Sequence, residues 1–264
     1  MNEGDTSRLE SIIKRDQAIL LSSLCAAVVL SWVYLVHLAG RMADMPAAVE
    51  VAVAQLRPWS PIDFVLIFLM WTVMMVGMMG PSAMPAILDF AASSHKQQEH
   101  GHPLASTGVF ALGYIVVWTG FSLLATGLQW GLHSAALLSP MMVSTSPLLG
   151  GGLLITAGVY QWTPILNIFL KRCRNPLELI MKGWSRGSSA FVMGMENGTN
   201  CLGCCLVVMA LLFVGGVMNL LWVAGITIFV LIEKAVPYGD MTGRISAVAL
   251  MLVGLFVIVR SLIG

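Results

Sequence analysis

Charged residues are scarce in this chain. They make up 10% of its 264 residues, whereas hydrophobic residues make up 58%, and soluble domains carry about 25% charged residues. The formal net charge is only +1, which argues against a globally basic nucleic-acid-binding protein. The composition therefore predicts an integral membrane protein that contacts the lipid bilayer and no nucleic acid.

Sequence signatures of catalysis are also missing. The sequence shows no nucleophile with a matched base and orienting group, no phosphate-binding glycine loop and no zinc-hydrolase motif. We therefore expect a protein that is not an enzyme.

Long apolar stretches dominate what is present. A helix needs about 20 apolar residues to cross a hydrocarbon core about 30 Å thick. Seven stretches qualify, and they predict an all-α, polytopic transmembrane bundle with a tail at 1–17 and one membrane domain at 18–264. The expected spans are 18–39, 62–92, 104–131, 147–170, 188–214, 218–234 and 242–263.

The distribution of Lys and Arg predicts the orientation, because these residues gather on the cytoplasmic side of membrane proteins. With the N-terminus inside, most of the 14 basic residues fall in inner segments, including the cluster Lys171–Arg174. We expect a multi-pass protein of the bacterial inner membrane with a cytoplasmic N-terminus. On this topology Cys173, Glu233 and Lys234 lie at the cytoplasmic surface, with snorkelling sufficient to explain Lys234.

Proline and glycine predict local features of three spans. Asp63, after Ser60 and Pro61, suits a helix N-terminus and is read as a capping residue. Pro81 cannot donate to the carbonyl of Gly77, so the second span should kink and that oxygen needs another donor. The glycines of the third span predict a seam for close helix packing: Gly113, Gly120, Gly127 and Gly131. Gly194 and Gly198 in the fifth span predict either close packing or local unwinding.

The fifth span carries the main candidate site. Cys201, Cys204 and Cys205 are spaced i, i+3 and i+4, so their sulfurs can lie toward one face of a helix. Glu196 and Asn200 precede them in the same apolar segment, where polar side chains are costly and usually functional. We expect these two residues to support the site or to couple it to protons.

A stripe of methionines on the second span offers further sulfur ligands. Met70, Met74 and Met78 recur at four-residue spacing, and both they and Cys201 are expected in the outer leaflet. Thiolates and thioethers select Cu(I) over harder divalent ions. Met74 and Met78 are therefore expected as auxiliary ligands to a Cu(I) ion held by the three cysteines.

Two other interpretations remain open from the residues alone. Buried cysteines and methionines also serve as polarizable packing residues, which would make the chain an assembly or scaffold subunit. Alternatively, Cys201-x-x-Cys204 has the spacing of thiol-exchange motifs, which would indicate a membrane redox protein.

Several short motifs resemble an uncharacterised bacterial family of predicted metal-binding integral membrane proteins. They include Trp71-x-x-Met74, Met78-Met79-Gly80-Pro81-Ser82, Gly158-x-Tyr160-Gln161-x-Thr163-Pro164, Cys173-Arg174-x-Pro176, Cys201-x-Gly203-Cys204-Cys205, Met218-Asn219 and Glu233-Lys234. The resemblance covers about residues 60–260 and implies a metal site at the cysteine triplet. It departs from the family at Phe169, where members carry another cysteine, and at Leu206, where they carry tryptophan.

Together these observations predict a membrane protein that binds or passes a soft metal, with copper as Cu(I) the expected ion. The predicted ligands are Cys201, Cys204, Cys205, Met74 and Met78, supported by Glu196 and Asn200. The expected partner is a soluble protein that donates or accepts the metal. Cys25 and Cys173 are expected to stand apart from the site.

Overall fold

The structure is a computed structural model that describes residues 3–43, 60–97, 103–135, 146–235 and 239–263. All regular elements in these ranges are helices, so the predicted all-helical class is confirmed. The helices are α1 (Glu3–Ala43), α3 (Pro61–Gln97), α4 (Pro103–Ser134), α5 (Pro147–Gln161), α6 (Pro164–Arg174), α7 (Pro176–Ser185), α8 (Ala190–Ala210), α9 (Leu212–Gly215), α10 (Leu220–Ala235) and α11 (Gly239–Ile263).

Five of the described helices are long and apolar enough to cross a membrane, which agrees with the predicted membrane protein. They are α1, α3, α4, α11 and α8 with its short continuation. A sixth span results if α5 and α6 are counted as one bent span. The predicted span at 218–234 corresponds to α10, which has 16 residues. A helix of this length extends about 24 Å, which is less than the roughly 30 Å of the hydrocarbon core. The expected count of seven spans therefore stays a prediction.

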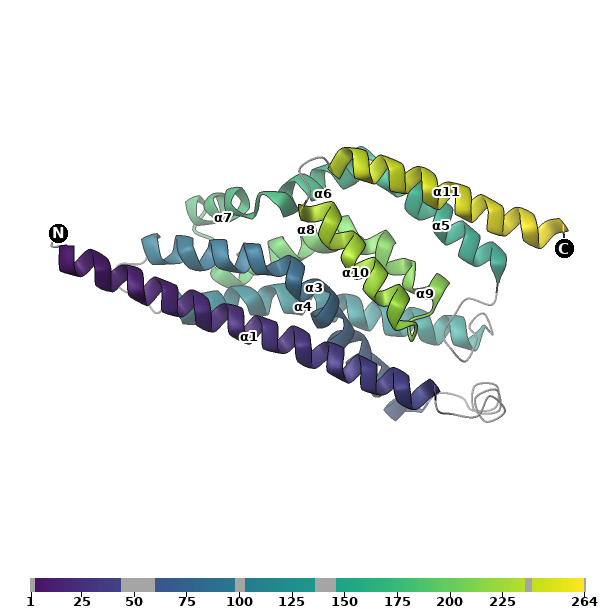
Figure 1. Cartoon of the computed structure of the whole chain (residues 1–264), viewed down its shortest axis with the longest axis horizontal. Helices are drawn as coiled ribbons and strands as arrows, with labels where there is room; N and C mark the ends of the chain where they lie inside the picture. Colours follow the sequence, from purple (N-terminus) through teal and green to yellow (C-terminus); the bar gives the residue numbers. More distant parts are fainter. Residues whose placement is uncertain (1–2, 44–59, 98–102, 136–145, 236–238, 264) are drawn as a thin grey trace.

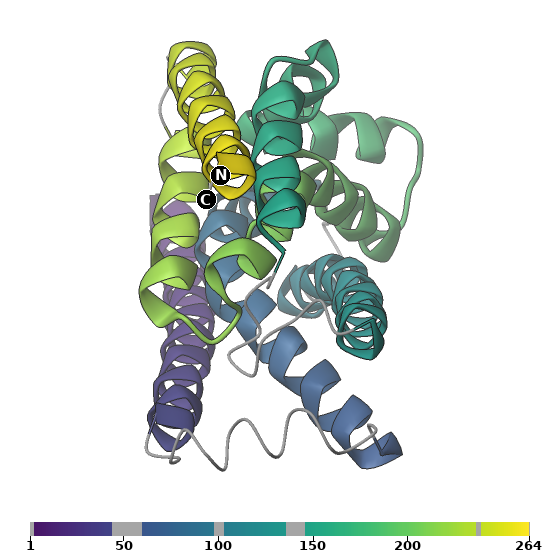
Figure 2. The same cartoon turned by 90° about the vertical axis from the view of Figure 1, so that its right-hand side faces the viewer.

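The helices pack in two groups that share α8 and α10. Helix α4 lies between α3 and α8, and α1 packs along α3, whereas α11 packs along α5. Figure 1 shows α5 and α11 side by side at one edge and α1 at the opposite edge, and Figure 2 shows the same arrangement from the side. Helix α6 returns onto α8, which matters for the site below.

Helix α3 begins and bends as its sequence predicts. The backbone N–H and the hydroxyl of Ser60 both donate to Asp63 Oδ2 at 2.8 Å, which confirms Asp63 as a capping residue. Pro81 lies inside the helix, and Figure 1 shows α3 changing direction along its length. The carbonyl of Gly77, which Pro81 leaves without a helical donor, accepts instead from Trp32 Nε1 of α1 at 3.3 Å.

Glycines bring α4 and α8 into backbone contact. A Cβ atom at Gly113 would lie 2.3 Å from the carbonyl oxygen of Phe191, and one at Gly194 would lie 2.0 Å from that of Phe110. Helix α8 runs unbroken past Gly194, so this glycine serves close packing and not unwinding. Gly120, Gly127 and Gly131 do not extend this seam within the chain, because Cβ atoms there would have no described residue within 4 Å.

The expected span 147–170 is broken near its middle. Thr163 caps a new helix by accepting from the N–H of Leu166 at 3.4 Å, and Pro164 occupies its first position. The axes of α5 and α6 differ by 68°. The chain therefore turns at Trp162 and Thr163 and carries α6 back against α8.

Candidate metal centre

The cysteine triplet lies on one buried stretch of α8. Ser189 caps this helix by accepting from Val192 N at 3.4 Å. Cys201, Cys204 and Cys205 are 4%, 1% and 1% exposed. The three thiols therefore lie together on a buried part of α8, as their spacing predicts.

Cys204 is the centre of a chain of sulfur contacts. Its Sγ lies 3.4 Å from Sγ of Cys205 and 3.5 Å from Sγ of Cys173 on α6. The expectation that Cys173 stands apart from the triplet is therefore wrong. The prediction failed because it placed 147–170 in one membrane span with Cys173 beyond its cytoplasmic end, whereas the 68° turn folds α6 onto α8.

Two contacts hold α6 and the end of α5 against the cysteine motif. The hydroxyl of Tyr160 donates to the carbonyl of Gly203 at 2.6 Å. The ring of Phe169 lies so close to Gly203 that an added Cβ would be 2.8 Å from it. The central glycine of the Cys201-x-Gly203-Cys204-Cys205 motif thus makes room for an aromatic ring, and this packing brings Cys173 to Cys204.

Cys201, whose carbonyl accepts from Cys204 Sγ at 3.1 Å, also has partners on other helices. Nζ of Lys234 lies 2.9 Å from Cys201 Sγ and also donates to Ser82 Oγ at 3.2 Å. The hydroxyl of Tyr114 lies 3.0 Å from the same sulfur. The expectation that Lys234 snorkels to the membrane surface is wrong, because its ammonium points inward and joins α10, α3 and α8. A cation beside a sulfur favours the thiolate, which is the form that binds metal.

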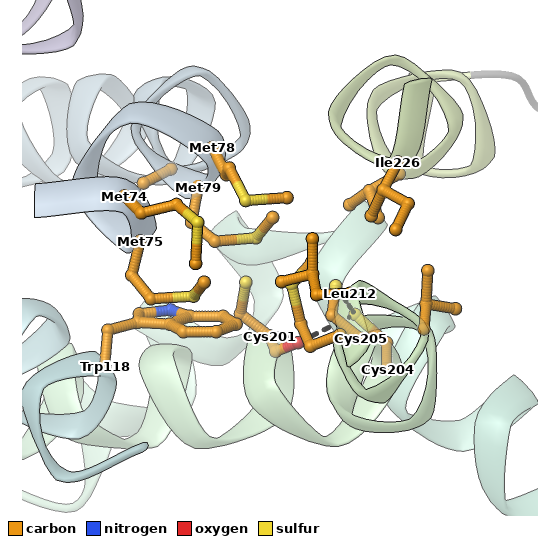
Figure 3. Packing of buried hydrophobic residues seen from close by; sticks show 14 of the residues in the cluster. Met74, Met75, Met78, Met79, Trp118, Cys201, Cys204, Cys205, Leu212 and Ile226 are labelled. Atoms are coloured by element: carbon orange, nitrogen blue, oxygen red, sulfur yellow. Dashed lines mark hydrogen bonds between the residues drawn. The ribbon is translucent and has the colours of Figure 1, made fainter. Parts of the chain in front are cut away.

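The predicted methionine ligands lie in the same core. Met74, Met75, Met78 and Met79 are each no more than 1% exposed. Figure 3 shows their thioether side chains reaching from α3 toward the side of α8 that carries Cys201. Two of these methionines, Met75 and Met79, were not among the predicted ligands, because the four-residue spacing selected only one face of α3.

Glu196 and Asn200 line a cavity between α6, α7 and α8. The Glu196 carboxylate accepts two hydrogen bonds from Arg186, at 2.8 and 3.0 Å. Asn200 donates to the carbonyl of Glu196 at 2.7 Å and accepts from Arg172 Nη1 at 3.4 Å. Asn200 is nevertheless one residue from Cys201 and one helical turn from Cys204.

A buried glutamate and a half-buried arginine meet near the site, a contact that the sequence did not predict. Glu233 is only 2% exposed, and Arg174 Nη2 donates to its main-chain carbonyl at 2.5 Å. Among the described residues, Glu233 Oε1 and Arg174 Nε have no hydrogen-bond partner. The dipeptides Cys173-Arg174 and Glu233-Lys234 thus meet beside the triplet, whereas the sequence placed both at the cytoplasmic surface.

The sulfurs are close enough to share an ion but are packed against one another. No three His, Cys, Asp or Glu side chains in the described ranges are spaced to hold a metal ion as they stand. Thiolates bind zinc-sized ions at about 2.3 Å, so three of them around one ion would lie roughly 4 Å apart. Sulfur separations of 3.4 and 3.5 Å would have to widen by about half an ångström, which side-chain rotation can supply.

One family model matches most of the chain. The model, PpoB2, is described as a copper chaperone and covers residues 68–257. This range contains Cys173, Cys201, Cys204, Cys205 and Lys234, and it leaves out Cys25 of α1. The expected relation to copper is thereby confirmed for the family. Comparisons with curated proteins and with solved structures found no match.

Proposed function

This chain belongs to the PpoB2 family of copper chaperones, and from this premise we propose that it binds Cu(I) inside the membrane and passes it to another protein. The ligands are Cys204 with its neighbours Cys173 and Cys205, and Cys201 beside Lys234. Copper is the cargo, and no catalysed reaction is part of the proposal. The membrane is the bacterial inner membrane, with the N-terminus and the Lys171–Arg174 cluster on the cytoplasmic side.

The observation that carries this proposal is the contact of Cys204 with two other thiols, its neighbour Cys205 at 3.4 Å and Cys173 of α6 at 3.5 Å. Soft thiolate ligands prefer Cu(I) to hard divalent ions. Cu(I) is stable with few ligands, so two or three of these sulfurs suffice. The buried thioethers of Met78 and Met79 add soft donors beside Cys201, along which a bound ion can move.

Copper analysis of the purified protein tests the proposal. The wild type, the triple variant C201S/C204S/C205S and the control Cys25→Ser are loaded with Cu(I) under anaerobic, reducing conditions. Cys25 is an exposed cysteine outside the matched range, so its removal controls for unspecific thiol binding. We expect stoichiometric copper in the wild type and in Cys25→Ser, and loss of copper in the triple variant.

Equal, substoichiometric copper in all three proteins would overturn the proposal and favour a scaffold role. X-ray absorption at the copper edge adds a second readout, because sulfur-only coordination is expected in the wild type. Oxygen or nitrogen ligands there would place the copper elsewhere.

A thiol-redox role is the second candidate, because Cys173 and Cys204 bring two sulfurs on different helices to 3.5 Å. Oxidation followed by peptide mapping would then yield a Cys173–Cys204 disulfide that reductant reverses. Persistence of free thiols at both positions under oxidising conditions would argue against this role.

A further inference from the structure

The cavity between α6, α7 and α8 has a size and charge that the copper ligands do not explain. Its volume is about 1070 Å³, at the upper end of small-molecule sites. Its lining combines apolar side chains of α6 and α8 with four cationic residues and two carboxylates. The cations are Lys171, Arg172, Lys182 and Arg186, and the carboxylates are Glu178 and Glu196.

The cavity keeps a positive excess after its internal ion pairs are formed. Lys182 pairs with Glu178 at 2.6 Å, and Arg186 pairs with Glu196 at 2.8 Å. The hydrogen bond and charge of Lys182 lower the pKa of Glu178, so this carboxylate stays ionised. Lys171 makes no ion pair with a described residue, and Arg172 has only the 3.4 Å contact with Asn200. Two positive charges remain to attract an anion.

Two residues that line the cavity are neighbours of cysteines in the sequence, although no cysteine is among the described residues that line the cavity itself. They are Arg172 and Asn200, which contact each other at 3.4 Å. Arg172 directly precedes Cys173, and Asn200 lies one turn before Cys204 on the same face of α8. Of the four clustered cysteines, Cys173 is the half-buried one, and the other three are buried. Cys173 is therefore the least covered of the four clustered cysteines.

We propose that this cavity receives Cu(I) as an anionic complex with a small carboxylate-bearing thiol and delivers the ion to Cys173. This inference rests on the proposed function and names the chemical form in which copper is loaded. The positive lining binds the carboxylates of the donor, and the apolar wall accommodates its carbon chain. Copper then moves from Cys173 to Cys204 and Cys205 through the contacts at 3.5 and 3.4 Å.

The transfer is a ligand exchange without a change of oxidation state. A bond forms between the Cys173 sulfur and copper, and the bond between copper and a donor sulfur breaks. The proton lost by the Cys173 thiol goes to the departing donor thiolate. Neither an oxidant nor a reductant is consumed.

Loading rates from two copper donors test the proposal. The anionic donor is the Cu(I)–glutathione complex, and the cationic donor is the Cu(I)–acetonitrile complex. The test variant K171Q/K182Q removes two cavity cations without touching a cysteine. The matched control R244Q/R260Q removes two exposed cations of α11, outside the cavity.

We expect K171Q/K182Q to load about tenfold more slowly than wild type from the glutathione complex at low salt. Electrostatic attraction raises the association rate of a charged ligand by about 10-fold or more. Loading from the acetonitrile complex should be unchanged, and R244Q/R260Q should behave as wild type with both donors. S-methylglutathione, which keeps the carboxylates but lacks the free thiol, should slow loading only from glutathione.

Equal rates in K171Q/K182Q and wild type, or equal slowing with both donors, would overturn the proposal while copper binding itself stands. Absence of copper uptake from either donor would instead refute the proposed function, and this inference with it. Loss of co-purified anionic phospholipid from K171Q/K182Q without a change in loading rate would assign the cavity to a lipid headgroup.

Discussion

The contact of α4 with α8 yields a quantitative prediction, because this contact fixes the helix that carries the cysteines. In Gly113→Ala, the new Cβ would lie 2.3 Å from the Phe191 oxygen and 2.9 Å from Met195 N. Ordinary contact begins at 3.4 Å, so the two helices must separate by about 1 Å. Both clashing atoms belong to the backbone, so no side chain can rotate away to relieve them.

The cost follows from known effects of overpacking. Inserting a methyl group into a tightly packed contact destabilises a protein by about 1–3 kcal/mol. Replacing glycine by alanine inside a helix stabilises it by about 0.5–1 kcal/mol. Gly113→Ala should therefore destabilise the protein by about 1–2 kcal/mol. Gly120→Ala, on the same helix but facing open space, should be neutral or stabilising by up to about 1 kcal/mol.

Thermal unfolding of the detergent-solubilised protein measures this difference. The two variants should differ by about 1–3 kcal/mol, so at roughly 2–4 °C per kcal/mol the Tm of Gly113→Ala should fall about 2–12 °C below that of Gly120→Ala. Copper affinity should also fall in Gly113→Ala alone, because Met195 lies less than two turns from Cys201. Equal Tm values for the two variants would show that α4 and α8 are not in backbone contact at Gly113.

Three further variants address the site and its surroundings. Cys173→Ser should lower Cu(I) affinity in a competition with bicinchoninate, and an affinity equal to that of wild type would remove Cys173 from the ligand set. Lys234→Gln should weaken Cu(I) binding about ten- to a hundredfold, since a hydrogen bond to a charged group contributes about 1.5–3 kcal/mol; unchanged affinity would show that its contact with Cys201 is incidental. Trp32→Phe removes the donor to the Gly77 carbonyl, and its Tm should drop about 2–4 °C for the roughly 1 kcal/mol lost, whereas an unaltered Tm would mean that water replaces the indole.

Local features of the fold were predictable because neighbouring residues determine them. The cap at Asp63 follows from a carboxylate in the first helical turn, and the unpaired Gly77 carbonyl follows from proline four residues later. The donor that satisfies this carbonyl, Trp32, was not predictable. It comes from another helix, and nothing in the spacing of α1 and α3 sets their relative rotation.

The cysteine triplet was predictable from helical spacing, whereas its partners Cys173 and Lys234 were not. Both had been assigned to the cytoplasmic surface because they lie at the ends of predicted spans. Thr163-Pro164 carried the signal of a new helix, since threonine is a good cap and proline favours the first position. The direction in which α6 then runs depends on contacts distant in sequence, such as that of Phe169 with Gly203.

Lys234 also bears on which ion suits this site. Burying net charge in a medium of low dielectric is costly, so a neutral cluster is favoured. Cu(I) held by two thiolates carries one negative charge, which the ammonium beside Cys201 balances. A divalent ion and the same two thiolates form a complex with no net charge. The lysine would give this complex an excess positive charge, so a third thiolate would be needed to balance it. Lys234→Gln should therefore shift the preference of the site from Cu(I) toward Zn²⁺, a change of selectivity that a purely structural role of the lysine would not produce.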